Sequence, residues 1–145
     1  MQEDSVLRVT DGVEFVLPIP VRYVIHKELC LIMTVAEGRV TFDEAKAHQE
    51  RLLKDPNFDR DFNELIDVTN ASGLDLSSEQ LRSLSLSIPF VTKARRAIVA
   101  SRPAEFGVGR MYQAHYEKQH KEVSVFYDRD QALKWLGVPE DSGLF

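Results

Sequence analysis

The chain has 145 residues, a net charge of -5 and one cysteine. This length suits a single domain with one core, and the acidic balance disfavours nonspecific binding to nucleic acid or anionic membranes. One cysteine excludes an intramolecular disulfide. No apolar run approaches the roughly 18 residues of a membrane span, so we expect a soluble cytoplasmic protein with no integral membrane association and no nucleic-acid partner.

The first twenty residues predict an extension. Two apolar segments, VLRV and VEFVLP, are separated by Thr10, Asp11 and Gly12, and Asp-Gly favours a tight hairpin turn. Pro18 and Pro20 cannot donate ladder hydrogen bonds and therefore mark the passage into the main domain. We divide the chain into a hairpin extension over residues 1–20, a domain over 21–137 and a C-terminal tail over 138–145.

Two strands are expected to open the main domain. They span Val21 to Ile25 and Leu29 to Ala36, around a short polar turn. The second run is too uniformly apolar to face water on one side, so it predicts a central strand. Cys30 lies inside this run, and we expect its thiol to be buried.

The rest of the chain alternates strands with capped helices. Short apolar runs at 62–68, 95–100 and 122–127 predict three strands. A capping box at Thr41–Glu44 predicts a helix to about Lys54, and SSEQ at Ser77–Gln80 begins a second helix that ends at Pro89. Pro103 opens a third helix, to about Lys118, and Asp128 caps a last one. This order predicts an α/β fold with a largely parallel sheet.

Metal and catalytic motifs do not fit. Asp55, Asn57, Asp59 and Asp61 have the spacing of a calcium loop, but Arg60 replaces its glycine and Ile66 its last glutamate. We instead expect local turn hydrogen bonds there. His26, His48, His115 and His120 lack metal-ligand spacing, and we interpret them as structural or surface residues. We therefore predict no metal, no cofactor and no catalytic residue, that is, a protein that is not an enzyme.

A glycine pair, Gly107 and Gly109, forms a lone GxG motif. Tyr112 stands where a dinucleotide fingerprint requires its third glycine. We expect both glycines to allow close packing of the third helix against the sheet.

A long stretch of the chain resembles a known superfamily. The run VRYVIHKELCLIMTVAEGRVTFDEAKAHQERLLKDPNFDRDFNELIDVTNASGLDLS is followed by RRAIVA, EFGVGRMYQ, VSVFYD and ALKWLG. Together these resemble the SpoIIAA-like superfamily, in particular small bacterial proteins described as STAS-like or CRAL-TRIO-like. The resemblance implies a single α/β domain with a mixed sheet of four to five strands and about four helices mainly on one face. It implies no enzymatic activity, but a regulatory or protein-interaction role, or a lipid pocket.

The resemblance also implies a phosphoacceptor. In the antagonist proteins of this superfamily, a serine in an Asp-Ser-Ser-Gly stretch is phosphorylated by a partner kinase. The corresponding stretch here is Asp75, Leu76, Ser77 and Ser78, so the order is altered and the glycine is absent. Ser77 and Ser78 are the candidate phosphoacceptors. The alternative is that Ser77 is only an N-cap.

A second candidate site lies at the start of the third helix. Arg102 and Arg110 flank it, close to where strands of an open sheet end, and Phe106 and Tyr112 offer apolar walls. These four residues suit a small anionic or lipid-like ligand. The alternative is a solvated basic face.

Two functions from different classes therefore stay open. The first is a regulatory module with an unidentified protein partner, and the second is a small-ligand binding protein. A homodimer is also open, because strand alternation puts Val13, Phe15 and Leu17 on one apolar face of the extension.

Overall fold

The structure is a computed structural model that describes residues 5–8, 14–17, 19–87, 93–119 and 121–145. Its strands are β1 (Ser5–Arg8), β2 (Glu14–Leu17), β3 (Val21–His26), β4 (Leu31–Thr41), β5 (Asn63–Asp75), β6 (Arg95–Val99) and β7 (Glu122–Phe126). Its α-helices are α1 (Phe42–Lys54), α2 (Ser78–Ser87), α3 (Pro103–Glu117) and α4 (Arg129–Trp135), and short 3₁₀ turns lie at Lys27–Leu29 and Glu140–Ser142.

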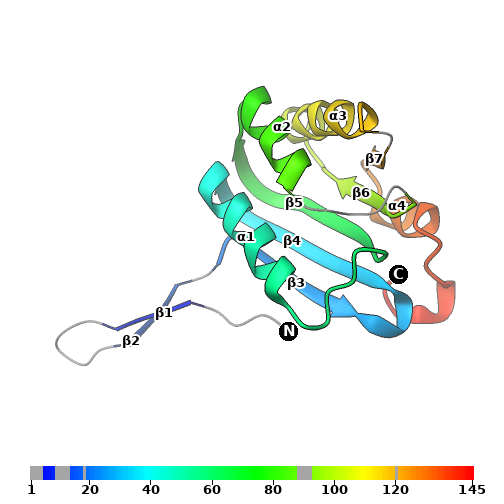
Figure 1. Ribbon diagram of the computed structural model, residues 1–145, viewed down its shortest axis with the longest axis horizontal. Helices are drawn as coiled ribbons and strands as arrows, with labels where there is room; N and C mark the ends of the chain where they lie inside the picture. The colour runs from blue at the N-terminus through cyan, green and yellow to red at the C-terminus, as the bar shows by residue number, and fades with distance from the viewer. Residues whose placement is uncertain (1–4, 9–13, 18, 88–92, 120) are drawn as a thin grey trace.

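A five-stranded mixed sheet organises the domain. Its order is β3-β4-β5-β6-β7, with β3 antiparallel to β4 and every other neighbouring pair parallel. Helices α1, α2 and α3 pack on one face and α4 on the other (Figure 1). The predicted α/β class, strand number and helix distribution are confirmed. None of the helices in the described ranges is long and apolar enough to cross a membrane.

The N-terminal strands form a separate pair. β1 and β2 run antiparallel, with Ser5 opposite Leu17, and lie outside the five-stranded sheet. This agrees with a hairpin extension. The expected turn at 10–12 and the apolar face of Phe15 and Leu17 lie outside what the structure describes, and so does Pro89.

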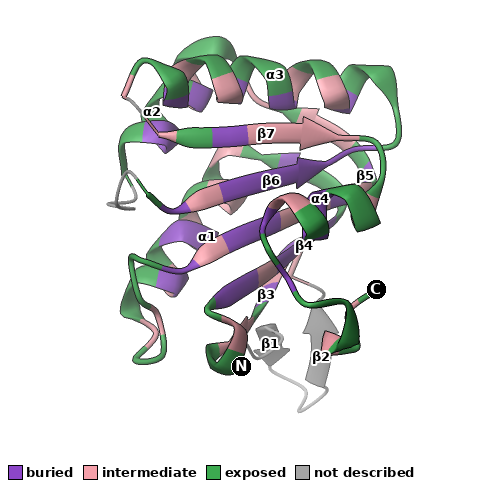
Figure 2. Cartoon of the chain, turned by 90° about the vertical axis from the view of Figure 1, so that its right-hand side faces the viewer, coloured by how far each residue is buried: buried purple, intermediate pink, exposed green. Residues whose placement is uncertain are grey.

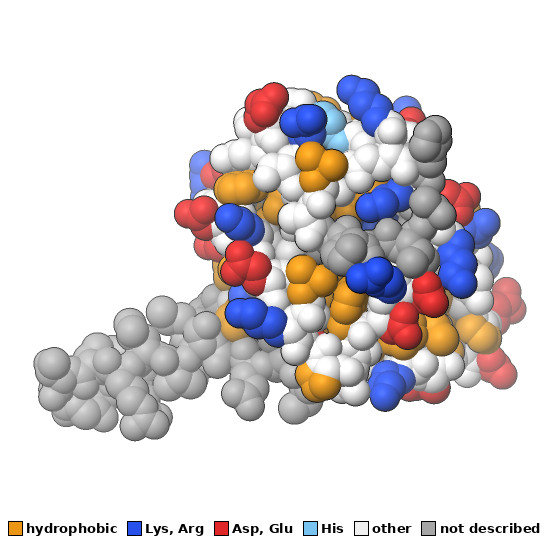
Figure 3. All heavy atoms as spheres, in the orientation of Figure 1, with side chains coloured by type: hydrophobic (Ala, Val, Ile, Leu, Met, Phe, Trp, Pro, Cys, Tyr) orange, Lys and Arg blue, Asp and Glu red, His pale blue; other side chains and the backbone are white. Residues whose placement is uncertain are grey.

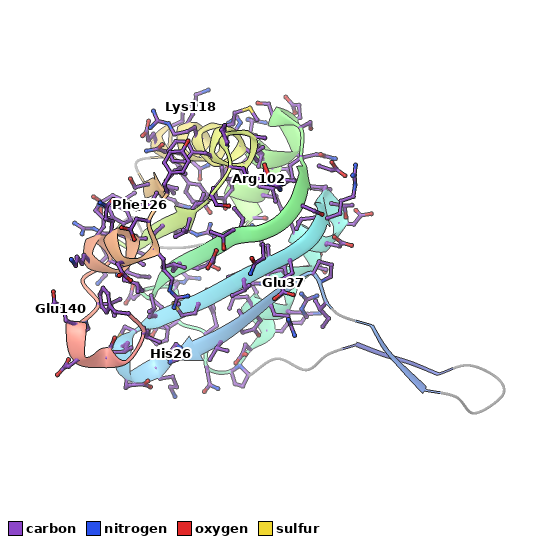
Figure 4. The ribbon with its side chains drawn as sticks, turned by 180° about the vertical axis from the view of Figure 1, so that it is seen from behind. His26, Glu37, Arg102, Lys118, Phe126 and Glu140 are labelled. Carbon is purple, nitrogen blue, oxygen red and sulfur yellow. The ribbon has the colours of Figure 1, made fainter. Side chains whose placement is uncertain are left out.

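The two faces of the sheet follow from strand alternation. On β6, Arg96 and Ile98 face α1–α3, whereas Ala97 and Val99 pack beneath α4. Most of β6 is buried between the two layers (Figure 2). Both faces of this strand are covered, so its residues Ala97 to Val99 are all apolar. On the α4 face, the C-terminal residues continue the cover through Val138, while the sheet near Glu37 carries no described helix (Figure 4).

The helix starts agree with their capping signals. The Thr41 hydroxyl accepts from the Glu44 amide while the Glu44 carboxylate accepts from the Thr41 amide. Ser77 and Gln80 make the same reciprocal pair at α2. Asp128 accepts from the Asp130 amide at α4. These side chains occupy amides that have no partner within their own helix.

The turn before β4 corrects one expectation. Cys30 is exposed, not buried, and its φ of 50° places it in the left-handed region after the Lys27–Leu29 turn. The turn is therefore longer than its polar letters indicate, and β4 begins at Leu31. β5 is also longer than expected, because it follows β4 in parallel as far as the pair Thr41 and Asp75.

The two glycines of α3 have different surroundings. A Cβ on Gly109 would lie 3.1 Å from a methyl group of Val125, so this glycine does permit close packing of α3 on β7. The expectation for Gly107 is wrong, because a Cβ there would meet nothing within 4 Å. In the acidic loop, Asp55 and Asp59 accept from the amides of Asn57 and Asp61, which confirms the expected turn hydrogen bonds.

Candidate ligand pocket

The four residues predicted as an anion site do not share one surface. Tyr112 is buried and points toward the sheet, whereas Arg110 is exposed. Arg102 donates to the carbonyl of Ala71 at 2.5 Å and pairs with Glu105 one turn further along α3. This pairing neutralises the charge of Arg102, one of the two cations that were expected to hold an anion.

Phe106, one of the two aromatic residues of that set, has another partner. The Phe106 ring stacks on the exposed ring of Tyr127, with centroids 4.1 Å apart and planes 7° apart. On the face seen in Figure 3, positive and negative side chains are interspersed, with apolar side chains between them. No single-sign patch distinguishes that face among the described residues.

Both predicted phosphoacceptors are exposed at the start of α2. The Ser77 hydroxyl accepts from the Gln80 amide at 3.2 Å, as an N-cap does. The Ser78 hydroxyl lies 3.3 Å from Nε2 of His115 on α3. Ser77 therefore has a structural role, whether or not it is modified.

An apolar cavity lies between the sheet and the three helices of its crowded face. It has a volume of about 110 Å³, is partly open to solvent and is walled mainly by aliphatic side chains. Ala45 belongs to the α1 wall, Leu81 and Leu84 to the α2 wall, and Gly109 to the α3 wall. The cavity therefore lies where three helices and four strands meet.

Buried polar side chains form one end of this cavity. Arg96 and Thr34 both contribute to its wall, and both bind the fully buried carboxylate of Glu64. Arg96 donates from Nε and Nη2 to Glu64 Oε1, at 3.0 and 2.5 Å, and Thr34 donates to Oε2 at 2.6 Å. Arg96 Nη1 donates to the hydroxyls of Tyr112 and Tyr116, which are themselves hydrogen-bonded. Two adjacent strands and α3 thus enclose an ion pair whose net charge is zero.

The environment keeps Glu64 ionised. Burial alone would raise its pKa, but the charge of Arg96, together with His48 and the Thr34 hydroxyl, lowers the pKa to about 2. Burial has the dominant effect on Tyr112, whose pKa is raised well above its ordinary value, so its hydroxyl stays protonated. Glu64 and Arg96 therefore form a charged pair at neutral pH, while the Tyr112 hydroxyl stays neutral.

His48 on α1 completes the polar end of the cavity. The residue is 6% exposed, and its Nε2 lies 3.6 Å from Glu64 Oε2, beyond hydrogen-bond distance. Neither ring nitrogen has a hydrogen-bond partner among the described residues. The Tyr23 ring packs edge-on against the imidazole, with centroids 5.6 Å apart. A buried imidazole without a partner is costly, so this position calls for an explanation.

Comparison with solved structures bears on the fold. The chain matches an uncharacterized protein of the DUF3478 family, described as having a SpoIIAA-like fold, from Shewanella loihica PV-4. The match covers 92% of each chain, with a TM-score of 0.51 and 19% sequence identity. This chain has a SpoIIAA-like fold. No family model and no curated protein matches the sequence.

Within this SpoIIAA-like fold, the residues at the polar end of the cavity were missed as a site. The sequence did hold a signal, since Glu64 and Arg96 interrupt apolar strands on the side that alternation assigns to the core. They stand opposite each other in the β5–β6 register. His48 carried no comparable signal, and its interpretation as a structural or surface residue overlooked its place in the cavity wall.

Proposed function

We propose that this protein binds a small, largely apolar molecule in the cavity between its sheet and helices α1, α2 and α3. The observation that carries the proposal is an aliphatic cavity whose wall includes the buried imidazole of His48, neither nitrogen of which has a hydrogen-bond partner among the described residues. Ligand pockets commonly combine apolar walls with a few polar groups that fix orientation. The role is binding rather than catalysis.

The energetic cost of the cavity favours this function over a packing defect. At ~24 cal/mol per Å³, a volume of about 110 Å³ corresponds to ~3 kcal/mol of lost packing. That cost is large beside the 5–15 kcal/mol by which domains are typically stable, and a bound ligand would recover part of it. The volume is somewhat below the ~150 Å³ of an engineered cavity that accepts benzene, so only a short apolar group fits inside.

A filling variant tests the proposal. Ala45 contributes to the cavity wall, so Ala45→Leu places extra methyl groups in the space, while Ala114→Leu adds the same groups at an exposed position of α3. We expect 1-hexanol or toluene, each added below its solubility limit in water, to raise the Tm of wild type and Ala114→Leu by a few degrees, and to leave Ala45→Leu unchanged. Equal responses in all three proteins would refute binding in the cavity.

Native mass spectrometry of the full chain, purified from its own host, addresses the natural ligand. A noncovalent mass that disappears on denaturation and is missing from Ala45→Leu supports the proposal. A clean protein mass in both proteins counts against a tightly held ligand.

A second candidate function is a regulatory interaction module controlled at α2. It is favoured by the exposure of Ser78 and by its 3.3 Å approach to His115, because a phosphate there would meet helix amides and an imidazole together. Phosphosite mapping of the protein from its own host tests it. Phosphate on Ser77 or Ser78 supports the switch, and complete absence of phosphate under several growth conditions contradicts it. The protein partner and the cytoplasmic location stay predictions.

A further inference from the structure

The charges at the polar end of the cavity bear on what kind of ligand it takes. Arg96 is the cavity's cationic side chain among the described residues, and it would ordinarily suggest a carboxylate or phosphate ligand. Here its guanidinium is directed at Glu64 by two hydrogen bonds and at two tyrosine hydroxyls by two more. Its charge is already balanced by a carboxylate of equal burial.

An anion entering here would therefore lose its hydration without gaining a net countercharge from the Arg96–Glu64 pair. Transfer of a charged group into an apolar environment is far more costly than transfer of a hydroxyl or carbonyl. The Glu64 carboxylate lies close to His48, at 3.6 Å, so an anion bonded to this imidazole would also lie near a like charge. These two effects disfavour anions independently of cavity size.

A neutral polar group meets different conditions at His48. An imidazole ring offers a nitrogen that donates or a nitrogen that accepts, so it can bond to either an alcohol or a carbonyl. Nε2 faces Glu64, which leaves Nδ1 for another partner, and Nδ1 is buried with no hydrogen-bond partner among the described residues. One hydrogen bond there would satisfy a polar atom that the fold itself does not.

We infer that the cavity selects a ligand with a short apolar body and one uncharged hydrogen-bonding group, an alcohol or a carbonyl, which bonds to His48. The inference rests on the proposed binding function and adds the chemical class of the ligand. This ligand class differs from the anion predicted at the start of α3, because the cation inside the cavity, Arg96, is already paired with Glu64.

Four probes of similar size separate the alternatives. They are 1-hexanol, hexanoate, hexylammonium and toluene, titrated at pH 7 into the full chain with binding followed by NMR. Binding is assigned to the cavity only where Ala45→Leu abolishes it. We expect 1-hexanol to bind at least tenfold more tightly than hexanoate or hexylammonium, and to shift the ring nitrogen signals of His48.

A variant of the imidazole tests its role. His48→Phe keeps an aromatic ring and removes both nitrogens, and we expect it to weaken 1-hexanol about three- to tenfold while leaving toluene unchanged. Hexanoate binding more tightly than 1-hexanol in wild type would overturn the inference, and this comparison needs no variant. Equal loss of toluene and 1-hexanol in His48→Phe would overturn the role of His48. If toluene fails to bind as well, the proposed function itself is wrong.

Discussion

Replacement of Glu64 by glutamine is the sharpest test of the buried cluster. Glu64→Gln keeps the shape of the side chain and removes the charge that balances Arg96, at a site that is 0% exposed. Breaking a buried ion pair by removing one partner typically costs 3–5 kcal/mol, because an uncompensated charge stays buried. From its ordinary value of 4.5, the pKa of Glu64 falls to about 2, which corresponds to ~3 kcal/mol of stability at neutral pH.

Urea unfolding at pH 7 measures this cost as a change in the free energy of unfolding. The matched control is Glu122→Gln, which removes the carboxylate 3.1 Å from Arg95 on the neighbouring strand pair. The side chains of Arg95 and Glu122 are 43% and 52% exposed, respectively, so we expect the control to cost less than ~1 kcal/mol. A Glu64→Gln variant as stable as the control would refute the role assigned to the pair.

Removal of both charges completes a double-mutant cycle for Glu64 and Arg96. Arg96→Met with Glu64→Gln leaves no buried ion, so we expect the double variant to be more stable than the sum of the two single losses predicts. Additive losses would show that the two charges act independently.

The pH dependence gives an independent check with a definite sign. The folded pKa of Glu64 lies below the unfolded one, so its contribution is fully present above about pH 4.5 and is lost as the pH falls toward 2. Without Arg96, burial raises this pKa instead, and Arg96→Met should lose stability as the pH rises through 4.5 and above. Stability curves of wild type and Arg96→Met with the same slope between pH 3 and 6 would contradict this account.

Three smaller predictions concern local structure. Gly109→Ala should cost ~1–3 kcal/mol in urea unfolding because its Cβ meets Val125, whereas Gly107→Ala should stabilise by ~0.5–1 kcal/mol; the opposite order would contradict the packing of α3 on β7. Ser77→Ala should lose ~1 kcal/mol through the α2 cap, and an unchanged Tm would count against that cap. Cys30 should react with a thiol reagent in the native protein nearly as fast as in urea, and strong native protection would contradict its exposure.

Much of the fold was readable from local signals. Capping residues such as Thr41 fixed where helices begin, and continuous apolar runs indicated strands covered on both faces. Cys30 was misplaced because the turn that begins with charged residues ends in two apolar ones, Leu29 and Cys30, and only the left-handed backbone at Cys30 reveals this. Apolar periodicity cannot distinguish a strand from a turn whose residues are themselves apolar.

The candidate site was harder to predict. The basic residues of α3 are conspicuous in the sequence, but Arg102 is neutralised by Glu105, a contact that depends on side-chain placement. The cavity exists because the side chains of three helices do not fill the space above the sheet. Hydrophobic patterns in the sequence do not predict the volume of such a cavity. Glu64 and Arg96 were visible as polar interruptions of apolar strands, 32 residues apart, but their pairing follows only from the strand order.

The buried pair also restricts how the strands can align. Glu64 stands opposite Arg96 in the register of β5 and β6. A slip by one residue would turn Arg96 toward the apolar packing beneath α4, and a slip by two would leave both charges among aliphatic neighbours. Neighbouring parallel strands made of Leu, Ile, Val and Ala have little else to distinguish one alignment from the next. The ion pair therefore favours one strand register. A misaligned sheet would bury both charges without their partners, and this cost exceeds the stability that the pair adds to the correct alignment.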